Sequence, residues 1–93
     1  MSGELMKIKD GYLLRNIADE WIIVPIGARI HDFNGLMTVN ETGAFLWQTL
    51  AEGCTQEYLI KAMMAEYDVD IKTAENDVRE FIDSLTAGDV LIV

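Results

Sequence analysis

Two apolar segments separated by a short polar turn lie near the beginning of the chain. Residues 12–17 and 21–26 are rich in Leu, Ile, Val and aromatic side chains, and Asp19 and Glu20 lie between them. Apolar segments of this length, bounded by turn residues, are typical of paired strands, so the pattern predicts an antiparallel hairpin. Pro25 has no amide hydrogen to donate, so it should lie near the end of its strand or at a bulge.

A third apolar stretch, Leu36 to Val39, follows an irregular polar segment from Gly27 to Gly35. Asn34-Gly35 suits a tight turn, because both residues tolerate positive φ angles. The predicted third strand contains no Lys or Pro, the residues that usually keep an exposed sheet edge from pairing with another chain. Its edge is therefore a candidate docking site. Equally, the strand could be bare because it is too short to aggregate, or the tail from Val90 to Val93 or a second copy of the chain could cover it.

Apolar residues at three- and four-residue intervals predict three helices after this strand. Asn40 caps the first helix, because its side-chain oxygen can accept an otherwise unpaired amide hydrogen, and Gly53 stops it. Thr55 caps the second helix. Asp70 caps the third, which has the most regular spacing of apolar positions, and Gly88 ends it.

The order of these elements predicts one α+β domain over residues 1–93, with a loose start over residues 1–8. A three-stranded antiparallel sheet followed by three helices suggests a winged helix-turn-helix-like arrangement. In most DNA-reading proteins of that type the wing follows the recognition helix, whereas here the sheet comes first. The apolar tail after Gly88 is expected to form a short strand or to pack against the core.

The charge balance narrows the function. With 16 Asp and Glu against 7 Lys and Arg, the chain has a formal charge of -9, which repels phosphate backbones and anionic lipids. We therefore expect neither a nucleic-acid nor a membrane partner. The longest apolar run, residues 21–26, is far shorter than the roughly 20 residues of a membrane helix. One cysteine and no recognisable secretory signal predict a cytoplasmic location.

No group of residues predicts catalysis, a metal site or a cofactor. His31 and Cys54 are too few and too isolated to form a ligand set or an oriented catalytic pair. A helix N-terminus could lower the pKa of the Cys54 thiol, but a small structural residue is the better interpretation. Trp21 and Trp47 could stack on a ligand, yet their apolar surroundings favour core packing. We expect a protein that is not an enzyme.

The junction between the third strand and the first helix resembles a known family. Residues 36–44 read Leu-Met-Thr-Val-Asn-Glu-Thr-Gly-Ala. They are similar to the strand-to-helix motif of PqqD-like proteins, in which an apolar residue precedes Asn-Glu-Thr-(Gly/Ala)-Ala. The likeness covers roughly Lys9 to Leu91 and continues at Trp47 and in residues 55–59, 65–69 and 77–82.

This resemblance implies a peptide-recognition domain of the RiPP recognition element type. Such a domain binds the leader of a ribosomally made precursor and presents it to a modifying enzyme, often a radical-SAM enzyme. In the family, the leader adds as an antiparallel strand beside the third strand and lies in a groove against the third helix. Carried over, the resemblance assigns the ladder to Leu36, Met37, Thr38 and Val39, and the groove wall to Glu75, Arg79, Ile82 and Asp83.

The resemblance does not identify the pathway, since standalone domains of this kind accompany many different peptides. Without the resemblance, the acidic third helix is typical of a solvated surface. Arg79 could pair with a leader carboxylate, and Met37 at an exposed edge could adapt to varied side chains. An open edge would also permit a homodimer. The segment from Ala28 to Phe33 belongs to no motif that we can assign.

The alternative function is a winged-helix DNA-binding regulator, with the third helix as the reader. The charge of the third helix argues against DNA binding. Acidic residues outnumber Lys72 and Arg79 on that helix, so it would repel the phosphates of DNA. A small enzyme is a third possibility, disfavoured because no nucleophile, base or metal set converges.

Overall fold

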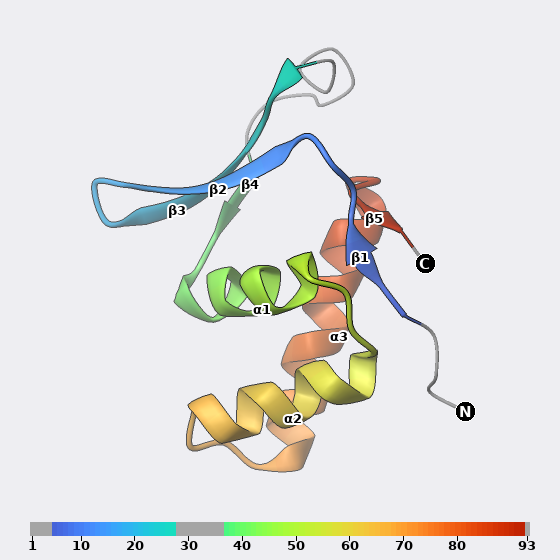
Figure 1. Cartoon of the computed structure of the whole chain (residues 1–93). Helices are drawn as coiled ribbons and strands as arrows, with labels where there is room; N and C mark the ends of the chain where they lie inside the picture. Colours follow the sequence, from blue (N-terminus) through green and yellow to red (C-terminus); the bar gives the residue numbers. More distant parts are fainter. Residues whose placement is uncertain (1–4, 28–36, 93) are drawn as a thin grey trace.

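The computed structural model describes residues 5–27 and 37–92. Strands and helices follow one another as predicted, with a short strand added at each end (Figure 1). The elements in chain order are β1 (Lys7–Ile8), β2 (Tyr12–Ile17), β3 (Glu20–Pro25), β4 (Met37–Val39), α1 (Glu41–Ala51), α2 (Gln56–Glu66), α3 (Ile71–Ala87) and β5 (Leu91–Ile92).

The main sheet has the order β2-β3-β4, with every neighbouring pair antiparallel. The hairpin turn consists of Ala18 and Asp19, both at positive φ (53° and 67°), as a two-residue turn of type I′ requires. Pro25 is the last residue of β3, as expected from its missing amide hydrogen. The predicted three-stranded sheet followed by three helices is confirmed.

Each predicted cap begins its helix. The side chain of Asn40 accepts a hydrogen bond from Gly43 N at 2.7 Å, and Thr55 accepts one at 3.1 Å from the third residue after it. Asp70 accepts a hydrogen bond from Thr73 N at 2.9 Å. The Thr73 side chain, and after it this backbone N–H, stabilise the ionised carboxylate, so they lower the pKa of Asp70 below its usual range.

The core lies between the sheet and the three helices. The middle strand contributes Ile23, and the helices contribute Leu50, Leu59 and Leu85, all fully buried. Trp47 is also buried and packs edge-to-face against Tyr12 of β2, with ring centroids 6.5 Å apart. The core position predicted for this tryptophan is confirmed.

The two ends of the described chain pair with each other rather than with the main sheet. β1 and β5 form a separate antiparallel pair, away from β4 (Figure 1). Met6 and Ile8 are buried, and Met6 N donates to Cys54 O at 2.8 Å. Residues 6–8 therefore differ from the expected loose start, because their apolar side chains close one side of the core. The tail forms a strand, and that strand does not cover the edge of β4.

The three helices in the described ranges are either too short or too polar to cross a membrane.

Candidate peptide-binding site

The register of the hairpin decides which way the backbone of β3 points. Gly11 O accepts a hydrogen bond from Ile26 N (2.8 Å) at the open end of the β2–β3 hairpin. In antiparallel strands, residue pairs that exchange hydrogen bonds alternate with pairs that do not. Ile26 therefore turns its N–H and C=O towards β2. Ile22 lies four residues earlier, an even number of positions, so its N–H and C=O also face β2. The N–H and C=O groups of Trp21 and Ile23 consequently face β4.

The same alternation turns the backbone of Thr38 towards the open edge. Met37 and Val39 pair with the two residues of β3 that face β4, whereas Thr38 lies opposite Ile22. The N–H and C=O of Thr38 therefore point away from β3. β4 is the last strand of its sheet, and no strand within residues 5–27 or 37–92 lies beyond it. One donor and one acceptor are thus left for an added strand.

A groove of about 500 Å³ runs along this edge, between β4 and the C-terminal half of α3. Its strand side consists of Met37, Thr38 and Val39. Residues three positions apart on one side of α3 form the opposite wall, which consists of Phe81, Ser84 and Ala87. The wall is apolar with one hydroxyl, a surface on which peptide side chains can pack.

Gly43, in the first turn of α1, allows β4, α1 and α3 to approach one another at this groove. A Cβ at this position would lie 3.0 Å from the Cβ of Val39 and 3.5 Å from Cε1 of Phe81. A Cβ here would require Val39 to shift by a few tenths of an ångström, and a larger side chain would require more. A small residue at this position of the motif therefore lets β4 lie close to α1 and α3.

A second hollow of about 220 Å³ lies between α1 and α3, next to the groove. The two hollows share Asn40, Gly43, Phe81 and Ser84, so they adjoin each other, and together they are called the trough. The second hollow adds Thr42, Leu46, Asp77 and Glu80. The trough therefore changes from apolar to acidic along its length.

The residues that the family resemblance assigns to peptide binding do not all lie at this groove. Met37, Thr38 and Val39 do, while Leu36 lies outside the described residues, as does His31. The four residues assigned on α3 are not brought to the groove. Glu75 lines a separate hollow between α2 and α3, Ile82 packs against the core, and Arg79 and Asp83 are exposed and line neither part of the trough.

The rotation of α3 explains this difference. Each residue turns a helix by about 100°. The buried stripe consists of Ala74, Val78 and Leu85. Phe81 and Ser84 lie on the flank that faces β4, and Glu75 and Ile82 lie on the opposite flank. The family resemblance did not single out Phe81, Ser84 and Ala87, which line the groove beside β4 in the structure.

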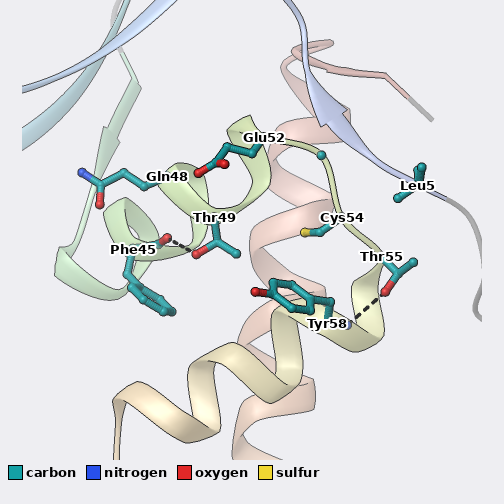
Figure 2. Close-up of a pocket in the computed structure, with 9 residues that line it drawn as sticks. Leu5, Phe45, Gln48, Thr49, Glu52, Cys54, Thr55 and Tyr58 are labelled. Atoms are coloured by element: carbon teal, nitrogen blue, oxygen red, sulfur yellow. Dashed lines mark hydrogen bonds between the residues drawn. The ribbon is translucent and has the colours of Figure 1, made fainter.

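Another hollow, of about 590 Å³, lies between the end of α1, the start of α2 and the segment before β1 (Figure 2). It is lined in part by the exposed Leu5 and Tyr58 and contains Cys54. Burial raises the pKa of the Cys54 thiol, so this sulfur stays protonated and is a poor nucleophile. The interpretation of Cys54 as a small structural residue agrees with its burial.

The sequence and the fold are both similar to known proteins. Residues 20–91 match the model of the family described as "Coenzyme PQQ synthesis protein D (PqqD)". No curated protein shows significant similarity to the chain. Among solved structures, TbiB1 in complex with the TbiA(beta) leader peptide matches with a TM-score of 0.73 and 29% sequence identity. The match covers 91% of this chain and 93% of that one.

The family match includes the hairpin from β3 onward, β4 and all three helices, so it contains both walls of the groove. The predicted fold, three antiparallel strands followed by three helices, is that of the structural match. The chain belongs to the PqqD family.

Proposed function

We propose that this protein binds the leader segment of a ribosomally synthesised precursor peptide by strand addition at β4. The observation that carries the proposal is the open edge at Thr38, whose N–H and C=O face a groove lined by α3. The similar TbiB1 structure holds a leader peptide, which supports a peptide as the occupant. Binding rather than catalysis is the expected role, because the site contains backbone groups and apolar side chains.

An added strand would use both parts of this site. Its backbone would pair with Thr38, and this pairing is independent of the peptide sequence. Side chains alternate across a sheet, so the residues on either side of the one opposite Thr38 would point into the groove. There they would contact Phe81, Ser84 and Ala87. The ladder would add affinity that does not depend on the peptide sequence, and these side-chain contacts would supply the rest of the affinity together with the selectivity.

We also propose that the bound precursor is presented to a modifying enzyme, which the family resemblance suggests is a radical-SAM maturase. A leader held along β4 keeps the core peptide attached to the domain, where an enzyme that docks on the same domain can reach it. The outer face of the sheet and the hollow at Cys54 stay free for such a partner when the groove is filled.

An NMR titration tests the binding step. The uniformly 15N-labelled protein is titrated with the leader of a short peptide encoded beside its gene. The amide signals of Thr38, Val39, Phe81 and Ser84 should shift most, and the Thr38 amide should become protected from hydrogen exchange. Shifts confined to Tyr58 and other residues around Cys54 would instead place the peptide in the other hollow.

The DNA-binding alternative has no supporting observation. The exposed part of α3 includes Glu75, Glu80 and Asp83, against the exposed basic residues Lys72 and Arg79. Phosphate approaching this helix would meet a net negative charge.

A further inference from the structure

The two ends of the trough differ in chemistry. At one end, Met37 of β4 approaches the C-terminus of α3, where its Cε lies 3.1 Å from the position of a Cβ on Gly88. In the middle, Val39 faces Phe81 across Gly43. Towards this end the trough offers mostly apolar surface.

At the other end the trough contains two carboxylates. Asp77 and Glu80 are three residues apart on α3, so they lie on the same side of the helix. Among the described residues, no Lys or Arg lines either hollow and neither carboxylate has an ion-pair partner. The formal charge of -9 adds to the negative potential there. A cation from an occupant would meet two unpaired acids.

The spacing of a strand relates these ends to positions in a peptide. Residues that face the groove recur every second position, with a rise of about 3.4 Å per residue. If two such residues lie opposite Met37 and Val39, the next one lies beyond Val39, at the hollow that contains Thr42 and Asp77. Antiparallel pairing is the more stable kind, and it places this third position towards the peptide N-terminus.

We propose that the groove selects a leader segment with the order basic-x-apolar-x-apolar, in which Asp77 and Glu80 bind the basic side chain. This inference rests on the proposed function and adds the chemistry of the substrate to it. The apolar pair would contact Phe81 and Ala87, while the basic residue would fix the direction and register of the strand. A three-residue strand specifies register weakly by itself.

Synthetic peptides test the selection directly. Three peptides with the same serine spacers are compared. The first reads lysine-serine-valine-serine-leucine from its N-terminus, the second has glutamate in place of lysine, and the third has the first sequence in reversed order. Each carries a fluorophore and is titrated with the intact protein at low salt. The first peptide should bind about tenfold more tightly than the glutamate peptide, and the difference should shrink at about 0.5 M salt. The reversed peptide should bind more weakly than the first.

Two matched double variants separate the site from the overall charge. Asp77→Asn with Glu80→Gln should abolish most of the preference for lysine over glutamate. Glu75→Gln with Asp83→Asn removes the same charge from the same helix, outside the trough, and should leave the preference unchanged. Circular dichroism checks that both variants fold.

The outcomes distinguish this inference from the proposed function. If the lysine and glutamate peptides bind with equal affinity and both shift the Thr38 amide, the basic requirement is wrong and strand addition stands. If both double variants reduce the preference equally, the effect is general charge and the assigned residues are wrong. If no peptide, including the genomic leader, shifts the Thr38 amide, the proposed function fails and this inference with it.

Discussion

The pair β1–β5 and the edge strand β4 are short apolar strands in one small domain, but they differ in how they are paired. β1 and β5 pair with each other, and Val90 beside them is fully buried. β4 is bound to its sheet on one side, and no strand of the described residues pairs with Thr38 on the other. The first region completes the core, whereas the second is fully formed without a partner. Stability and the proposed binding are therefore expected to depend on separate residues.

The largest expected effect is a loss of stability at the closed pair. Replacing Ile8 with Ala should lower the free energy of unfolding by about 2–5 kcal/mol, because this side chain is buried and its loss leaves a cavity. Lys7→Ala, on the exposed side of the same strand, should change it by less than about 0.5 kcal/mol. Urea unfolding measures both. If Ile8→Ala lowered the free energy of unfolding no more than Lys7→Ala does, β1 would not contribute to the core.

The next effect concerns binding at the open edge. Thr38→Pro removes the N–H that faces an added strand, and the proline ring occupies its place. Leader affinity should fall about tenfold or more, while the unfolding free energy changes little, because this amide has no partner in the sheet. Thr38→Val keeps the N–H and the branched side chain and should bind normally. Calorimetric titration measures the affinity, and a folded proline variant with full affinity would exclude this docking mode.

A pair of α3 variants sharpens the comparison further. Phe81 and Ile82 are both half-buried, but only Phe81 lines the groove. Phe81→Ala should weaken leader binding by several-fold, about 1 kcal/mol, through lost apolar contact. Ile82→Ala should reduce stability without a comparable loss of affinity per folded molecule. If only Ile82→Ala weakens binding, the flank indicated by the family resemblance is the correct one.

The smallest effect is a dependence of stability on pH at the N-terminus of α3, the helix that forms one wall of the groove. Hydrogen bonds from the side chain and then the backbone of Thr73 lower the pKa of Asp70 in the folded state. The contribution of this cap is present above the pKa of the unfolded chain and is lost as the pH falls through the lower, folded value. The thermal midpoint should therefore decrease between pH 5 and about pH 3. Asp70→Asn, which keeps a capping oxygen without the charge, should decrease less over the same range.

The parts of the fold that depend on local interactions could be predicted from the sequence. Asn40, Thr55 and Asp70 each bond to an amide three residues later, so the cap and its target are neighbours in the chain. The hairpin is present as predicted, but its turn is Ala18-Asp19, one residue before the predicted Asp19-Glu20, because Glu20 already pairs with Ile17 in the sheet. Such short-range features leave direct signals in residue type and spacing.

The features that could not be predicted from the sequence depend on distant contacts. β1 and β5 have two residues each, too few to show a period, and they pair across almost the whole chain. The wall of the groove depends on how α3 is rotated against β4. The positions on either side of the stripe of Val78 and Leu85 look alike in the sequence, and packing alone decides which flank faces the strand.

The small size of β4 limits how much main-chain pairing can contribute to peptide binding. With three residues in the strand and one of them turned outward, main-chain pairing contributes only about two hydrogen bonds, each with a net value near 1 kcal/mol. Micromolar affinity requires about 8 kcal/mol, so most of it must come from side chains in the trough. If the chain binds a leader as proposed, exchanging the side chains that line the trough would therefore change which precursor it takes far more than any change to β4 itself.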